Sequence, residues 1–95
     1  VTEAIAKFLE DLTHAGRSPH TRRAYATDLK QFAATYSKPL EDIGVDDLRR
    51  FFRQHADLSD ASQARKQNSL ASFLNWAYKQ ELILVNPMAK VDRVR

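Results

Sequence analysis

Residues 18–36 have the sequence SPHTRRAYATDLKQFAATY, and this stretch predicts one amphipathic helix. Ser18 suits the N-cap position, and Pro19 suits the first helical position because the N–H that it lacks would have no partner there. The large apolar side chains follow at the spacing i, i+4, i+7 and i+11: Tyr25, Leu29, Phe32 and Tyr36. At 100° per residue they span only about 60° of the helical wheel, so one face of this helix is predicted to enter a core.

Further helices are predicted on both sides of this stretch. The first follows Thr2 as N-cap and ends near residue 15, where Gly16 provides a left-handed stop. A third covers about 45–56, and Ser59 caps a long fourth helix at about 60–80, followed by a short turn of helix at 87–90. No alternating pattern typical of strands occurs. The sequence therefore predicts an all-α fold, a compact bundle of four to five helices.

Length and composition narrow the class of protein. A chain of 95 residues holds one domain, so we expect a single domain over 1–95, cut from a longer protein because the chain starts at Val1. The absence of cysteine excludes disulfide scaffolds, thiolate zinc sites and cysteine nucleophiles. The longest aliphatic run covers only 82–85, against the ~18 residues of a membrane span, and no secretory signal is visible. We expect a cytoplasmic protein with no membrane partner.

Charge is distributed unevenly along the chain. Fifteen Lys and Arg against twelve Asp and Glu give a net charge of +3, yet residues 12–27 and 61–80 contain no acid at all. If these two segments face the same way, the domain has a basic side, which favours a nucleic-acid partner. Two solvated faces without a partner are the alternative interpretation of the charge pattern alone.

The predicted fourth helix has two unlike halves. Its C-terminal half is amphipathic, and we expect Phe73 and Trp76 to be core residues and not platforms for base stacking. Residues 61–69 include no large apolar side chain, so this half is expected to project from the body or to lie against something polar. Small, amide and basic side chains suit the major groove of DNA; a solvated helix end is the alternative. Arg65 lies about 140° around the wheel from Leu70, so we expect it to point away from the core and to contribute little to stability.

Three motifs in register carry a resemblance to a known family. Residues 18–32 resemble the pattern S-x-x-T-x-x-x-Y-x-x-D-L-x-x-F, which opens the core-binding domain of tyrosine recombinases of the phage integrase and Xer type. Residues 62–73 resemble the family's T-x-x-R-x-L-x-x-L-x-x-F helix, and the N-P pair matches residues 86–87. The chain departs from the pattern at Ser62, where Thr is usual, and at Gln67, where an apolar residue is usual.

The resemblance implies a SAM-like DNA-binding domain that forms one jaw of a clamp, with its second and fourth helices in the major groove. Its expected partners are double-stranded DNA, the catalytic domain of the same chain and other recombinase protomers on DNA, and the isolated domain is expected to be monomeric. The alternative role of Thr21 and Ser62 is only to cap or support the ends of their helices. The expected DNA-binding residues lie at the start of the second helix and in the polar half of the fourth: His20, Thr21, Arg22, Arg23, Ser62, Arg65, Lys66 and Ser69.

We expect no catalytic residue, metal or cofactor in this chain. The resemblance places the nucleophilic tyrosine of DNA integration and recombination on a separate domain. Residues 14–17 spell H-x-x-R, but they fall at a helix end, and the three histidines lack metal-ligand spacing. A SAM-like protein-interaction module without DNA binding is the alternative function. An N-terminal arm-site DNA-binding domain is a weaker alternative, because such domains usually contain a sheet.

Overall fold

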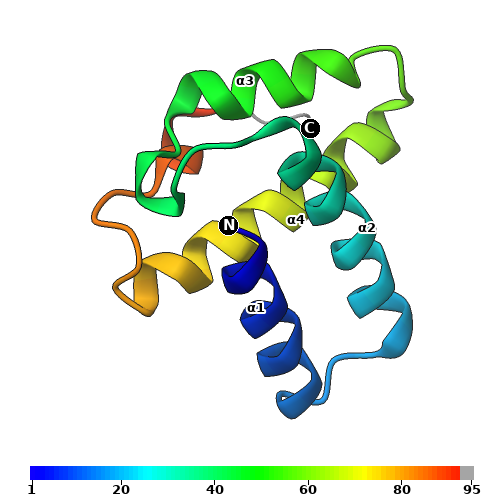
Figure 1. The fold of residues 1–95 in the computed structure, drawn as a ribbon. Helices are drawn as coiled ribbons and strands as arrows, with labels where there is room; N and C mark the ends of the chain where they lie inside the picture. Colours follow the sequence, from blue (N-terminus) through cyan, green and yellow to red (C-terminus); the bar gives the residue numbers. More distant parts are fainter. Residues whose placement is uncertain (93–95) are drawn as a thin grey trace.

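The computed structural model describes residues 1–92, and its elements are helices throughout. The four α-helices are α1 (Thr2–His14), α2 (Pro19–Thr35), α3 (Val45–Gln54) and α4 (Asp60–Lys79). Two short 3-10 helices, η1 (Leu40–Asp42) and η2 (Pro87–Lys90), follow α2 and α4. In Figure 1, α1 and α2 lie side by side and run in opposite directions, α4 crosses them, and α3 lies at the end away from the α1–α2 turn. No strand occurs in residues 1–92, which confirms the all-α fold.

Local capping explains most of the helix boundaries. The Ser18 and Ser59 hydroxyls accept hydrogen bonds from the backbone N–H groups of Thr21 and Ser62, both at 3.2 Å. Gly16, two residues after the end of α1, has the left-handed backbone conformation predicted for it, with φ +75°. The prediction of Thr2 as an N-cap is wrong: α1 already includes Thr2, and its N-cap is Val1, without a side-chain hydrogen bond. The helix still forms because its apolar face packs on the core.

The core lies where α1, α2, α3 and α4 meet. Leu29 and Phe32 of α2 are buried, and the Phe32 ring packs 5.5 Å from the Phe51 ring of α3. Phe73 of α4 is fully buried, and its ring centroid lies 5.6 Å from that of Phe8 in α1. Trp76 packs against both rings, so the predicted core role of Phe73 and Trp76 is confirmed.

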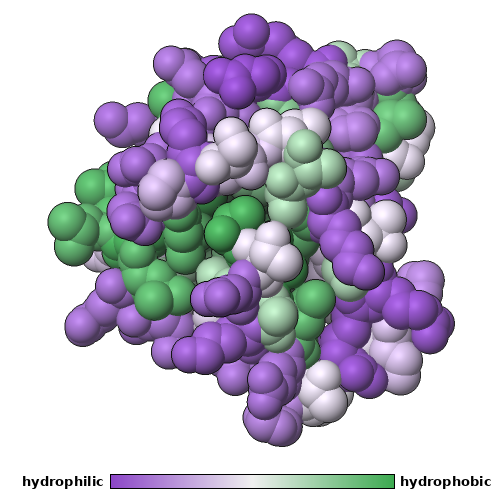
Figure 2. Space-filling view, viewed as in Figure 1, coloured by the Kyte–Doolittle hydropathy of each residue, from purple (hydrophilic) through white to green (hydrophobic). Residues whose placement is uncertain are grey.

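The connection from α4 to η2 leaves apolar side chains at the surface. Leu84 is 91% exposed and Val85 is 70% exposed, with Leu82 beside them in the chain. The green area at the left edge of Figure 2 lies over this connection. Within residues 1–92, no helix is both long enough and apolar enough to cross a membrane.

Candidate nucleic-acid interface

The polar half of α4 lies against α2 and does not project from the body. Lys66 and Gln67 are buried, and Ser69 is completely buried, although none of them is apolar. Gln63 is also used within the chain: its Nε2 donates to the Leu58 carbonyl at 2.7 Å. Of the two arrangements expected for this half, projection is therefore wrong, and contact with a polar surface is confirmed.

The polar surface that receives α4 is the carboxylate of Asp28, which is fully buried in α2. Arg65 approaches it with two nitrogens, Nη2 at 2.9 Å from Oδ1 and Nε at 3.3 Å from Oδ2. Lys66 donates from Nζ to Oδ1 at 3.0 Å, and Ser69 donates from Oγ to Oδ2 at 2.7 Å. The Lys66 ammonium also donates to Oε1 of Gln31 at 2.6 Å. Three side chains thus converge on Asp28, and Gln31 is attached to them through Lys66. We call these five residues the Asp28 cluster: Asp28, Gln31, Arg65, Lys66 and Ser69.

The Asp28 cluster keeps its carboxylate ionised. Burial raises the pKa of Asp28, but the hydrogen bonds from Arg65, Ser69 and Lys66 outweigh burial, and the pKa lies below its ordinary value of 3.8. One carboxylate thus faces two cations, an arginine and a lysine, so the cluster as a whole keeps one positive charge.

Arg65 is the member of the cluster that reaches the surface. Its side chain is 52% exposed, whereas that of Lys66 is 5% exposed. Arg65 is thus exposed, as expected of a side chain that points away from the core, but it also contacts an acid on α2 that its place on the helical wheel did not predict. Its outer side contributes to a shallow hollow of about 210 Å³ between the start of α2 and α4, lined by His20, Arg23, Ala24, Thr27 and Arg65.

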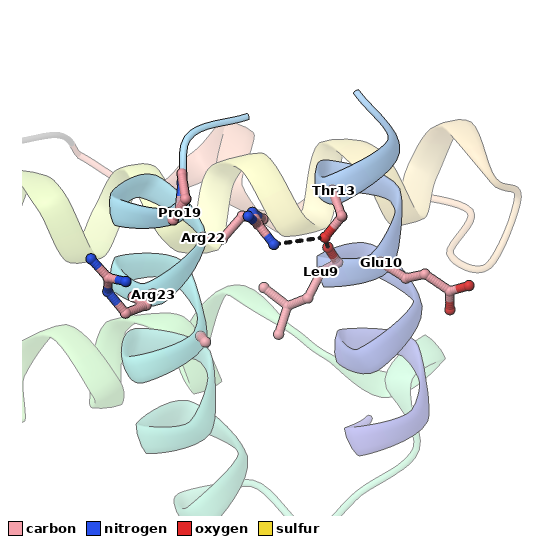
Figure 3. A pocket seen from close by; sticks show the side chains of 7 residues that line it. Leu9, Glu10, Thr13, Pro19, Arg22 and Arg23 are labelled. Atoms are coloured by element: carbon pink, nitrogen blue, oxygen red, sulfur yellow. Dashed lines mark hydrogen bonds between the residues drawn. The ribbon is translucent and has the colours of Figure 1, made fainter. Parts of the chain in front are cut away.

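Arg22 is directed to the other side of α2. Its Nη1 donates to the Thr13 hydroxyl of α1 at 3.0 Å, across a hollow of about 420 Å³ that also contains Leu9. Figure 3 shows Arg22 reaching toward Thr13 while Arg23 points away from α1. Arg23 lines both hollows, so the structure brings Arg23 together with Arg65 and leaves Arg22 on the α1 side.

Thr21 and Ser62 occupy equivalent places at the starts of α2 and α4. The Ser18 hydroxyl donates to Oγ1 of Thr21 at 3.0 Å, and the Ser59 hydroxyl donates to Oγ of Ser62 at 3.1 Å. The caps themselves are Ser18 and Ser59, so Thr21 and Ser62 support the helix ends and do not cap them. Their contact with DNA stays a prediction.

The phage integrase N-terminal SAM-like domain family matches residues 5–81. This chain belongs to that family. Tyrosine recombinase XerC of Chromobacterium violaceum is 37% identical over 90 residues, covering 92% of this chain and 30% of that protein. XerC of Thermodesulfovibrio yellowstonii is 31% identical over 94 residues, 96% of this chain and 31% of that protein. XerC of Mycobacterium tuberculosis is 32% identical over 82 residues, 81% of this chain and 28% of that protein. No solved structure matches the chain.

These matches confirm the resemblance to the N-terminal domain of a Xer-type tyrosine recombinase. The SAM-like integrase domain spans about a third of the length of the curated relatives that it matches. Among residues 1–92, no group of three histidines or acids is placed to hold a metal ion.

Sequence reasoning missed Asp28 and Gln31 as site residues of the SAM-like integrase domain. A signal for Asp28 was present, because it lies three residues after Tyr25 and four before Phe32, on the apolar face of α2. An acid on a core-facing position requires a buried partner, and the acid-free segment 61–80 contains Arg65 and Lys66. Gln31 gives no such signal, since it is an exposed residue with one long-range contact.

Proposed function

We propose that this domain is the DNA-binding jaw of a site-specific tyrosine recombinase, with the start of α2 and the polar half of α4 in the major groove. The observation that carries the proposal is the convergence of Arg23 and Arg65, from two helices, on one shallow hollow. The hollow also includes His20, and no acid lines it. Guanidinium groups in such a place bind phosphate oxygens or the edge of guanine.

The eight predicted DNA-binding residues divide into three groups in this proposal. Five of them contact DNA directly: His20, Thr21, Arg23, Ser62 and Arg65. Arg22 is not among these contacts, because it faces α1 and donates to Thr13. Lys66 and Ser69 are buried and donate to Asp28, so they support the interface from below. DNA binding therefore depends on them through the position of α4 against α2.

The chemistry of recombination belongs, in this proposal, to a catalytic domain outside the chain. That domain carries the nucleophilic tyrosine and closes the clamp on the opposite face of the DNA. DNA integration or recombination then needs further protomers on the same DNA. The family and its XerC relatives support this assignment.

A protein-interaction module is the alternative function, in which the acidic start of α3 would form one face of the partner site and the basic segments the other. The structure weakens this alternative because Asp47 is buried and already bound within the chain. Its Oδ2 accepts from the Gly44 N–H at 2.9 Å and from Lys38 Nζ at 3.3 Å. The neighbouring Asp46 is exposed, and its Oδ1 forms an ion pair with Arg49 at 3.7 Å.

The test is the binding of this chain to a short fluorescent duplex, titrated with salt. Arg65→Ala is expected to weaken binding by about 1–3 kcal/mol, uniformly across sequences for a phosphate contact or at one base position for a base contact. A lost phosphate contact also makes the slope of log affinity against log salt shallower by about one unit. A module that binds only protein gives no salt-dependent binding.

Lys79→Ala is the matched control, because it removes one positive charge about 21 Å farther along the same helix at 1.5 Å per residue. It is expected to change the affinity little, as is Glu3→Ala on α1. Equal affinities of Arg65→Ala and Lys79→Ala would remove α4 from the binding surface.

A further inference from the structure

We infer that Asp28 is a positioning residue for DNA binding: it holds the Arg65 guanidinium in a fixed orientation with its unused donors toward the hollow between α2 and α4. The inference rests on the proposed function, since it assumes that Arg65 contacts DNA. It adds a role for a buried acid, a residue type that ordinarily repels the DNA backbone.

The N–H donors of the Arg65 guanidinium divide between Asp28 and the exposed side of the residue. A guanidinium carries five N–H donors in one plane. Asp28 takes two of them, one on Nε and one on Nη2, in a bidentate contact that fixes the plane. Three donors are left, both on Nη1 and the second on Nη2, on a side chain that is half exposed. These three are available to a phosphate oxygen or a guanine edge.

Two other members of the Asp28 cluster, Lys66 and Ser69, hold the carboxylate itself. Lys66 and Ser69 bind one carboxylate oxygen each, and both are buried. Asp28 therefore cannot rotate away when Arg65 moves. Because Lys66 supplies a second positive charge, the acid does not cancel the charge that Arg65 offers to DNA.

A fixed guanidinium binds more tightly than a free one because less rotamer freedom is lost on binding. The loss avoided is about 0.5–1.5 kcal/mol for one long side chain, which corresponds to about 2- to 12-fold in affinity. Asp28 is thus expected to improve the affinity of DNA binding without touching DNA.

The sign of the effect separates this role from simple electrostatics. Asp28→Asn removes a negative charge and raises the net charge by one, so charge alone predicts tighter DNA binding. Loss of positioning predicts weaker binding, by about 2- to 12-fold. Only the positioning role gives a variant that is more basic and binds DNA less well.

The experiment measures the affinity of a short fluorescent duplex of mixed sequence for four proteins at low salt: the parent chain, Asp28→Asn, Arg65→Ala and the double variant. Circular dichroism gives the folded fraction, and affinities are compared per folded molecule. We expect Asp28→Asn to bind more weakly than the parent, and the double variant to bind no more weakly than Arg65→Ala alone. Without Arg65, Asp28 has nothing left to position, and only the favourable change in charge remains.

If Asp28→Asn does not fold, Ser69→Ala takes its place in the experiment. This variant keeps every charge and removes the hydrogen bond that the Ser69 hydroxyl donates to the Asp28 carboxylate. It is expected to weaken binding in the same direction and by a smaller factor. Unchanged or tighter binding by the folded positioning variant overturns the inference, as do additive losses in the double variant. If Arg65→Ala itself binds like the parent, the proposed contact of Arg65 fails; if only Arg65→Ala weakens binding, the inference about Asp28 fails alone.

Discussion

At the scale of single residues, Asp28 shows how a buried charge is kept in a small domain. Moving a carboxylate out of water is costly, and a buried ion pair often adds little net stability. Asp28 accepts four hydrogen bonds, two of them from Arg65 and one each from Lys66 and Ser69. The arrangement compensates the loss of water and determines where α4 lies on α2.

Asp28 and Asp47 make the stability of the fold depend on pH. Hydrogen bonds hold the pKa of Asp28 below 3.8, and the pKa of Asp47 is also lowered, since the Gly44 N–H and Lys38 outweigh its burial. The folded state therefore binds protons less readily than the unfolded chain. The stability from both groups is complete above their unfolded pKa and is lost as pH falls toward the folded one.

We predict that the free energy of unfolding, measured by urea denaturation, falls progressively below about pH 5. Asp47→Asn should reduce the steepness of that fall, because one of the two contributing carboxylates is gone. Asp46→Asn is the control for the loss of one negative charge from the same turn. An equally steep fall in Asp47→Asn and the parent chain would contradict the assignment.

At the scale of elements, α4 is one continuous helix with two kinds of contact. Its first half meets α2 through the Asp28 cluster, and its second half enters the aromatic core through Phe73. One helix of 20 residues serves both contacts because Lys66, Ser69 and Phe73 follow at i, i+3 and i+7 on the same buried face.

We predict that Phe73→Ala destabilises the domain by about 3–5 kcal/mol, a large part of the stability of a small protein. The reason is the cavity left among the rings of Phe8 and Trp76, which pack on Phe73. Thermal denaturation gives the result, with Tyr78→Ala as control for an aromatic side chain that is 50% exposed on the same helix. A Phe73→Ala variant that melts like the parent chain but loses DNA would show that the two halves are assigned wrongly.

The helices could be predicted from the sequence because their signals are local. Ser18 with Pro19 and Ser59 determine the starts of α2 and α4, and those predictions match the observed first residues. The burial of Lys66 and Ser69 could not be predicted from α4 alone. Their burial depends on the carboxylate of Asp28, which lies 38 residues before Lys66 and 41 before Ser69. Local sequence patterns do not determine how α2 packs against α4.

At the scale of the whole molecule, the proposed function makes this domain one side of a clamp. The chain spans about a third of its XerC relatives, and the hollow between α2 and α4 is small and open. We predict that this chain is monomeric and binds duplex DNA weakly, with a dissociation constant of about 10⁻⁴–10⁻⁶ M at physiological salt. Light scattering and fluorescence anisotropy measure the two quantities. Nanomolar, sequence-specific binding by this chain alone would contradict the prediction.

The double use of α4 also links ligand occupancy to folding. Arg65 and Phe73 belong to the same rigid helix, so local loosening of its first half disturbs the packing of its second half. A ligand that binds only the folded state adds its binding free energy to the stability of the fold. DNA bound at the polar half is thus expected to raise the melting temperature of the entire domain. Once the DNA concentration is well above the dissociation constant, the added stability increases with the logarithm of that concentration. The melting temperature of the aromatic core is therefore expected to depend on whether DNA is bound at the polar half of α4, although the core does not contact the DNA.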